Sequence, residues 1–451
     1  MLTTKFRSLL EEHHRKKWFP HKYPDVYGEF IDYVSEGMIQ DLLEQGKKDS
    51  STASVFVAYY IYQILPSVHF HDLFKENLNA YSEPVSERKV MPVYLYYYLR
   101  SLPEEESNSL WKAFKDWTVK WQTPMTEWLD AEIKFRKHFG ELARAHDQTL
   151  GLERHQEMMN LERGLRVSRE FFDWMLKKRT NASTLPALLQ YFRFKPSDEI
   201  ADWNDFGSLA KNFLEFSGIK KHAHLRRNDF EDATQTLFPI DPPRRLIQEF
   251  GRTAGIWDSA RFLYEFGKGM FYAGMNPGLS VEHRICGDPS LPSFWGYLYS
   301  LQLARKEGLN AIVNPRAESL AEDMSLCFQF WIRYEAVLAL YNNAVTTDLK
   351  DARDHYVSIF SNAFQFEAPS FVYLYDLERA AGSFWRVVAY RGALAVEERF
   401  RSLYGSRWFA SERCSARIRE YWRSGFQTTL KEILEDLDAS PDPDFLLTIK
   451  G

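Results

Sequence analysis

The sequence YEFGKGMF, at residues 264–271, decides how the rest of the chain is interpreted. It lies within a predicted helix over residues 258–275, which a polar residue would cap and the sequence GMNPG would end. Tyr264 and Lys268 are four residues apart, so they share one face of that helix. Glu265 precedes Lys268 by three residues, a spacing that allows an ion pair. Taken alone, this stretch is typical of an ordinary amphipathic helix.

The composition predicts a large folded protein. The chain has 451 residues, of which 45% are hydrophobic and 16% aromatic, enough for one large body or two to three packed domains. Its net charge of −5 gives no electrostatic basis for binding nucleic acid, which requires a basic surface that neutralises phosphates. We therefore expect no nucleic-acid partner.

The cysteines and the apolar segments predict a cytoplasmic protein. Cys286, Cys327 and Cys414 are far apart and lack a CxxC spacing, which favours reduced thiols over a disulfide framework. The charged N-terminal sequence has no apolar core of a secretory signal. The apolar run at residues 91–99 is much shorter than the roughly 18 residues of a membrane helix. We therefore expect no membrane insertion.

Helical periodicity dominates the chain on both sides of a short region with a different pattern. Apolar residues recur at spacings of three and four in an N-terminal helical region, residues 1–200. Residues 215–256 contain short alternating segments, turn residues and a Pro-Pro pair, which predict a small β-sheet. Helical patterns return over residues 308–436. The expected fold class is mainly α with one small sheet.

The region around the YEFGKGMF helix resembles the metal site of a peptidase family. Residues 262–303 are similar to the corresponding block of oligoendopeptidases and thimet-oligopeptidases, gluzincins whose helix reads H-E-F-G-H. The sequences NPGL and GDPS, at residues 276–279 and 287–290, resemble the two turns that follow that helix in the family. Residues 392–411 resemble its C-terminal helix and turn.

The resemblance covers about residues 215–425 and implies a zincin-like, oligopeptidase-like helical fold. The small sheet would lie at the edge of a central cleft. Residues 201–451 would form a degenerate zincin-like domain that contains the sheet, the helix over 258–275 and the C-terminal helices.

Carried over residue by residue, the resemblance implies that the zinc ligands are absent. The first histidine position is Tyr264, the second is Lys268, and the glutamate of the third ligand aligns near Ser293. The glutamate that would activate water is retained as Glu265. The implied protein holds no metal and no cofactor. We expect Lys268 to occupy part of the metal space and to pair with Glu265.

These residues predict a catalytically inactive metallopeptidase-like protein that binds a peptide or protein partner. One alternative is an enzyme with new chemistry in the same cleft, because Glu265, Lys268 and Tyr264 can all transfer protons. Another is a zinc peptidase with different ligands, such as His283 with Asp288. The sequence determines neither the partner nor the oligomeric state.

Further residues are predicted to line the cleft, and His283 and Asp288 are among them. The transition-state tyrosines of the family would align with residues 382–390, where this chain has Arg386 and, nearby, Tyr390. His222 and His224 lie in a predicted strand at the cleft edge, where their spacing places both on one face. Without a third ligand at a short spacing, contact with a substrate or partner is favoured over metal binding.

Overall fold

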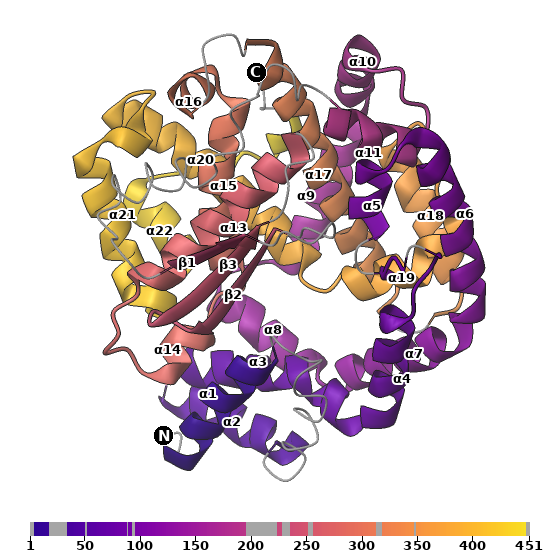
Figure 1. The fold of residues 1–451 in the computed structure, drawn as a ribbon. Helices are drawn as coiled ribbons and strands as arrows, with labels where there is room; N and C mark the ends of the chain where they lie inside the picture. The colour runs from indigo at the N-terminus through magenta and orange to yellow at the C-terminus, as the bar shows by residue number, and fades with distance from the viewer. Residues whose placement is uncertain are drawn as a thin grey trace.

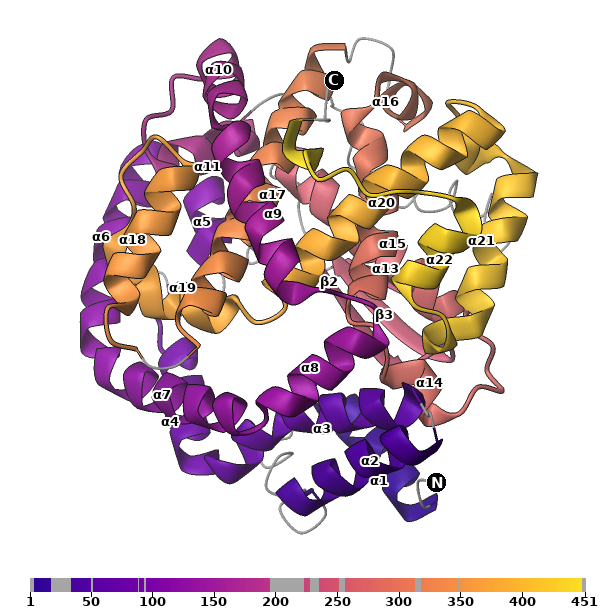
Figure 2. The ribbon, with the colours of Figure 1, turned by 180° about the vertical axis from the view of Figure 1, so that it is seen from behind.

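The structure is a computed structural model in which helices dominate (Figures 1 and 2). It describes residues 4–17, 34–49, 52–87, 89–92, 95–194, 223–227, 235–250, 256–312, 318–346 and 349–447. Within these ranges the strands form one three-stranded sheet, so the predicted fold class is confirmed. None of the described helices is both long enough and apolar enough to cross a membrane.

The N-terminal helices form an arc that carries the first part of the chain around the molecule (Figure 2). Apolar side chains repeat at helical spacing and are buried between neighbouring helices. Three glutamates, Glu104–Glu106, occupy the first turn of α6, where negative charge is favourable beside the positive end of the helix dipole. The helices are α1 (Thr4–Lys16), α2 (Glu36–Asp49), α3 (Thr52–His69), α4 (His71–Ser82), α5 (Leu95–Ser101), α6 (Glu104–Lys120), α7 (Gln122–His138), α8 (Gly140–Thr149), α9 (Arg154–Val167), α10 (Arg169–Arg179) and α11 (Leu185–Phe194).

The sheet lies within the predicted range. Strand β3 (Arg245–Phe250) is central, parallel to β1 (Ala223–Arg227) and antiparallel to β2 (Thr236–Asp241). Alternate residues of β2 and β3 are buried, and the buried side chains include Leu237 and Leu246. One face of the hairpin therefore contributes to the core, as the alternating pattern predicts.

The C-terminal helices pack around α15, whose residues are all buried. A hydrophobic core extends from these helices into the N-terminal ones. The predicted division into two domains near residue 200 stays a proposal, because buried residues on both sides of it belong to the same hydrophobic core. The helices are α13 (Ile256–Gly274), α14 (Val281–Ile285), α15 (Ser290–Ser300), α16 (Lys306–Ile312), α17 (Glu318–Ala344), α18 (Ala352–Ala363), α19 (Tyr373–Arg379), α20 (Ser383–Tyr404), α21 (Glu412–Ser424) and α22 (Leu430–Leu437).

Helices α13 and α15 approach each other closely because both carry glycine at the crossing. A Cβ atom on Gly267 would lie 2.4 Å from the carbonyl oxygen of Trp295. A Cβ atom on Gly296 would lie 2.7 Å from the carbonyl oxygen of Tyr264. Neither distance is compatible with a side chain, so these two glycines determine how near the helices come.

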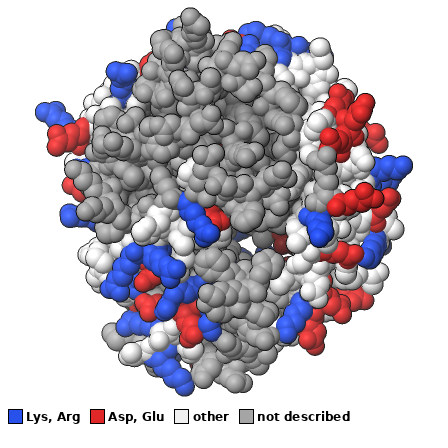
Figure 3. All heavy atoms as spheres, viewed as in Figure 1, with Lys and Arg blue, Asp and Glu red and all other residues white. Residues whose placement is uncertain are grey.

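The helices and the sheet surround a central opening. In both ribbon views the opening is bordered by the sheet, α8 and α19 (Figures 1 and 2). The space-filling view shows the surface hollowed at the same position (Figure 3). The sheet therefore lies beside this opening, at the position predicted for the edge of a central cleft.

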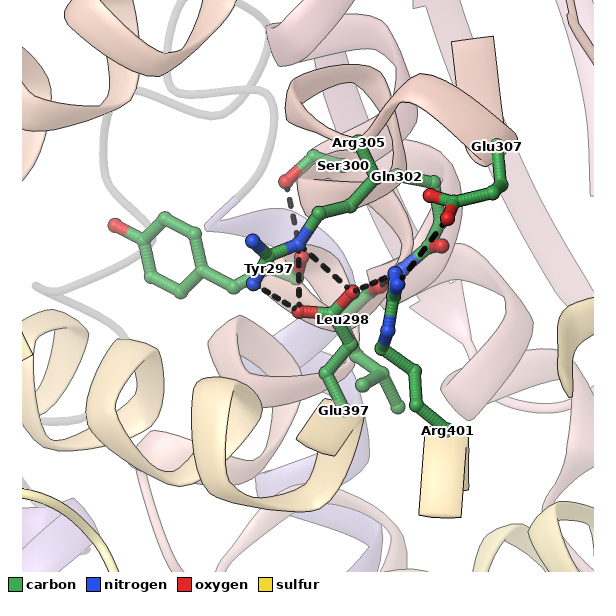
Figure 4. A network of polar contacts seen from close by, with 8 residues as sticks. All are labelled: Tyr297, Leu298, Ser300, Gln302, Arg305, Glu307, Glu397 and Arg401. Carbon is green, nitrogen blue, oxygen red and sulfur yellow. Dashed lines mark hydrogen bonds and ion pairs between the residues drawn. The ribbon is translucent and has the colours of Figure 1, made fainter. Parts of the chain in front are cut away.

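Two arginines with limited exposure join elements that are distant in sequence. Arg284 on α14 donates to Glu11 of α1 at 2.6 Å and to Asp241 of β2 at 3.2 Å, which fixes the first helix against the sheet. Arg305 follows α15 and forms a two-pronged ion pair with Glu397 of α20, with contacts of 2.7–3.2 Å (Figure 4). Such two-pronged pairs fix orientation as well as distance.

Arg333, on α17, caps two helices from inside the core. Its side chain is fully buried and donates to the last-turn carbonyl oxygens of Leu165 in α9, at 3.0 Å, and Ala363 in α18, at 2.9 Å. It also donates to Ser168. A cation is favoured at helix C-termini, whose last carbonyls lack partners within the helix. Burial nevertheless lowers the pKa of Arg333 to about 9.

We predict that Arg333→Met lowers the free energy of unfolding by about 2–4 kcal/mol, because it leaves several buried acceptors without donors. Urea unfolding followed by circular dichroism measures the change. Arg413→Met, at an exposed position of α21, is the matched control and should be nearly neutral. Equal effects of the two substitutions would contradict the capping role.

A partly buried acid on α19, Glu378, generates a prediction about pH. Burial, with Glu132 nearby, raises the pKa of Glu378 to about 7. The folded state therefore binds this proton more tightly than the unfolded chain does. The associated stability is present below the ordinary glutamate pKa of about 4.5 and is lost as the pH rises through 7.

Glu378→Gln should consequently stabilise the protein by about 2–3 kcal/mol at pH 8 and have little effect at pH 4.5. Chemical denaturation at both pH values measures the difference. Glu398→Gln, at an exposed position, should change stability little at either pH. A benefit of Glu378→Gln that is the same at both pH values would contradict the assignment.

Candidate functional site

Helix α13 carries the YEFGKGMF sequence and spans Ile256–Gly274, close to its predicted bounds. Leu263, Phe266 and Met270 recur at helical spacing and are buried, which fixes the rotation of the helix. Tyr264 and Lys268 consequently lie on one face, as predicted.

Tyr264 contacts Ser293 directly. The tyrosine hydroxyl, on α13, donates a hydrogen bond of 2.7 Å to the Ser293 Oγ atom on α15. Both residues are buried, with exposed fractions of 2% and 9%. The two side chains that were predicted to stand at or near the first and third ligand positions therefore hydrogen-bond to each other.

Glu265 is held between two cations of its own helix. The predicted pair with Lys268 is confirmed, since Nζ donates to Oε2 at 2.7 Å. The other carboxylate oxygen, Oε1, lies 3.3 Å from Nη2 of Arg261, four residues earlier. The Lys268 ammonium also lies 5.2 Å from the centroid of the Tyr264 ring, within cation–π range. The buried carboxylate is thus neutralised locally.

Aromatic rings enclose the Tyr264 side chain. Its ring lies 4.8 Å from Tyr297 of α15 and 5.2 Å from Trp331 of α17, between centroids. The guanidinium of Arg261 lies 5.5 Å from the Tyr264 centroid and 5.4 Å from that of Trp331. Burial raises the pKa of Tyr297 well above its usual range, so this phenol stays protonated. The Tyr264 ring therefore has fixed neighbours on several sides.

Arg386 belongs to the same cluster. On α20, its Nε atom lies 2.8 Å from Oε2 of Glu335 on α17. Glu335 also accepts from Ser383 at 2.7 Å and from the Trp331 indole at 3.3 Å. Burial opposes the charge on Arg386, but Glu335 raises its pKa above the ordinary value.

Tyr390 lies behind this cluster. It is fully buried, and its ring lies 5.1 Å from Tyr297 in an edge-to-face arrangement. Burial raises the pKa of its hydroxyl. The hydroxyl makes no hydrogen bond within the described part of the chain. The prediction that Tyr390 lines the cleft is not supported by this buried position.

Asp288 has a local structural role. Its Oδ1 accepts from the backbone N–H of Ser290 at 2.8 Å, and its Oδ2 accepts from the N–H of Leu430 at 2.8 Å. These bonds join the beginning of α15 to the beginning of α22. His283 is half-buried on α14, and burial lowers its pKa. The described residues show no contact between His283 and Asp288.

The two predicted cleft-edge histidines are only partly described. His224 is exposed on β1, where its Cα pairs with that of Ile247 on β3. His222 lies outside the described residues. Contact of these histidines with a partner stays a prediction.

Three members of the cluster were missed by sequence reasoning. Arg261 could have been found, because it precedes Glu265 by four residues on one helix. Trp331 and Glu335 lie on α17, far along the chain, and their sequence has no signal that connects them to α13. Only the packing of α17 against α13 and α20 brings them to the site.

The fold is shared with solved metallopeptidases. A structure assigned as oligoendopeptidase F aligns with a TM-score of 0.61 and 10% identity, over 96% of this chain and 82% of that one. PZ peptidase A, solved with an inhibitor, aligns at 0.64 and 9% identity, over 96% of this chain and 83% of that one. An M32 carboxypeptidase from Deinococcus radiodurans R1 aligns at 0.53 and 10% identity, over 98% of this chain and 96% of that one.

At these identities the similarity establishes the fold. No protein-family model matches the sequence, and no curated protein sequence matches it.

The residues of the site do not fit a zinc ion. Zinc in proteins is bound by imidazole nitrogen, thiolate or carboxylate. Here a phenol that donates to Ser293 and an ammonium that pairs with Glu265 occupy the two α13 positions. An ammonium has no lone pair and repels a cation. The described residues also contain no group of three or more His, Cys, Asp or Glu side chains that could hold a metal.

We predict that Lys268→Met destabilises the protein by about 1–3 kcal/mol, because it removes one of the two cations that neutralise buried Glu265. Adding Glu265→Gln should recover most of the loss. A double-mutant cycle on urea unfolding measures the coupling between the two side chains.

The pair Asp130–Lys134 is the matched control for this cycle. Its lysine is 72% exposed, and such surface pairs couple by about 0.5 kcal/mol or less. A coupling between Glu265 and Lys268 no larger than in this pair would contradict a charge-balancing role.

Proposed function

We propose that this chain is a catalytically inactive protein of the metallopeptidase fold, which binds a peptide or protein partner in its central cleft. The hydrogen bond between Tyr264 and Ser293 is the observation that carries this proposal. It joins the two positions that would have to separate around a metal ion. The zinc ligands of the resembling peptidases are, on this proposal, lost.

Loss of the ligands removes the basis of hydrolysis in this fold. Peptide hydrolysis by such enzymes depends on a metal that polarises the carbonyl and activates water. Glu265 remains, but each of its oxygens already contacts a cation. A carboxylate paired with two cations is a weaker base than a free one, and a general base alone supplies only a modest part of the rate enhancement.

Lys268 and Arg261 supply the positive charge that a metal would otherwise bring. A buried carboxylate without a partner is costly, so loss of a cation from this position would require compensation. The two side chains provide it from the same helix as Glu265. We infer that the site has been rebuilt to be stable without a metal.

The retained opening supports a binding role. A fold can keep its binding surface while the chemistry at the site changes. Here the ribbon leaves an opening between the sheet, α8 and α19 (Figures 1 and 2), while Tyr264 and Lys268 occupy the two α13 positions. The three cysteines are buried and form no disulfide bond, which supports the proposed cytoplasmic location.

Metal analysis and ligand restoration test the proposal together. We predict that the wild-type protein, purified without chelator, contains no stoichiometric zinc and leaves peptides intact. The triple variant Tyr264→His, Lys268→His and Ser293→Glu should bind about one zinc ion per chain, because it restores three ligands on α13 and α15. Inductively coupled plasma mass spectrometry measures the metal.

The single variant Tyr264→His is the control and should bind no stoichiometric zinc. Stoichiometric zinc in the wild-type protein would overturn the proposal. Hydrolysis of peptides by the wild-type protein, abolished by Glu265→Gln, would instead support the alternative of an enzyme with new chemistry.

A further inference from the structure

The part of the Tyr264 site that solvent reaches is positively charged. Arg261, Lys268 and Arg386 have side chains that are 33%, 23% and 25% exposed. The carboxylates that pair with them, Glu265 and Glu335, are only 5% and 11% exposed. The acids therefore lie beneath the cations and present almost no negative surface.

Two of the three cations lie beside one ring, and the third is joined to them through shared neighbours. The Lys268 ammonium and the Arg261 guanidinium lie 5.2 Å and 5.5 Å from the Tyr264 centroid. Arg386 joins them through Glu335, which it contacts at 2.8 Å and which accepts from the indole of Trp331, the ring that lies 5.4 Å from the Arg261 guanidinium. We call Arg261, Lys268 and Arg386 the cationic cluster. It comes from two helices that are widely separated in sequence, so the fold, and not a local charge run, assembles it.

The cluster has an excess of positive charge. Three cations face two carboxylates, which leaves one positive charge among these described residues. The chain as a whole has a net charge of −5, so this local sign is opposite to that of the molecule. A positive group in partly dehydrated, aromatic surroundings attracts an anion more strongly than the same group on an open surface.

We propose that the cationic cluster binds an aspartate or glutamate side chain of an acidic peptide segment. The inference rests on the proposed function and names the chemistry of the partner. Guanidinium groups offer paired N–H donors that match the geometry of a carboxylate. The buried acids hold Arg261, Lys268 and Arg386 in place, so the cluster is ordered before a ligand arrives.

A peptide fits this cluster better than a nucleic acid does. A nucleic acid carries a phosphate at every nucleotide and requires an extended basic surface. Acidic side chains instead gather on the side of the molecule formed by α6, whose first turn is Glu104–Glu106 (Figure 3). One localised cationic cluster suits a single carboxylate of an acidic segment.

Three synthetic decapeptides that alternate alanine with glutamate, glutamine or lysine test the proposal. Each carries a rhodamine label, and fluorescence anisotropy measures its binding to the full-length protein. The glutamate peptide should bind at least about tenfold more tightly than the glutamine peptide, and the lysine peptide more weakly still. Its affinity should fall as salt increases. A single-stranded ten-nucleotide oligonucleotide tests for attraction by charge alone.

Variants connect the binding to the cluster. Arg386→Gln and Arg261→Gln should each weaken binding of the glutamate peptide about tenfold, because each removes one cation of the cluster. Arg413→Gln, exposed on α21, is the matched control. Arg261 and Arg386 lie on different helices, so if one variant fails to fold, the other still tests the proposal. The salt dependence is measured on the wild-type protein and requires no variant.

Several outcomes would overturn the inference. They are equal binding of the glutamate and glutamine peptides, tighter binding of the lysine peptide or the oligonucleotide, absence of binding by all three peptides, or an unchanged affinity in both arginine variants. Mass spectrometry of the same mixtures separates this failure from that of the proposed function. Cleavage of any peptide would contradict catalytic inactivity, whichever peptide binds best.

Discussion

The close crossing of α13 and α15 is the constraint on which the site depends. Gly267 and Gly296 allow the two backbones to approach within a distance that any side chain would prevent. That approach brings the Tyr264 hydroxyl to Ser293 and places the Tyr264 ring against Tyr297. Helix α15 is entirely buried and also contacts α20. The position of α20, which carries Arg386, therefore depends on how α15 packs against α13.

Charge balance explains why the remaining side chains lie where they do. Glu265 and Glu335 are buried acids, and each has a cation within 3.3 Å or less. Taking a carboxylate out of water is costly unless a partner compensates, so Arg261, Lys268 and Arg386 are structural necessities before they are binding groups. In the same arrangement the cations are more exposed to solvent than the acids with which they pair. Stability and the proposed recognition of an anion therefore have one physical origin.

The sequence was sufficient for the features that depend on local spacing. Helical periodicity and turn residues predicted the mainly α fold, the small sheet and α13, and the three-residue spacing predicted the pair of Glu265 with Lys268. It was insufficient where packing decides. Tyr390 aligned near a cleft position but is buried, and Asp288 proved to join α15 to α22. Glu335 and Trp331 reach the site only because α17 packs beside α13, which no local pattern encodes.

The central proposal is that Tyr264 and Ser293 close the space that the resembling peptidases use for a metal. A crystal structure of the wild-type protein grown with excess zinc, with anomalous diffraction recorded at the zinc absorption edge, tests this claim most directly. The account predicts no anomalous peak between α13 and α15, with the Tyr264 hydroxyl at hydrogen-bond distance from Ser293. A zinc peak at that position, with the two side chains separated around it, would contradict the account.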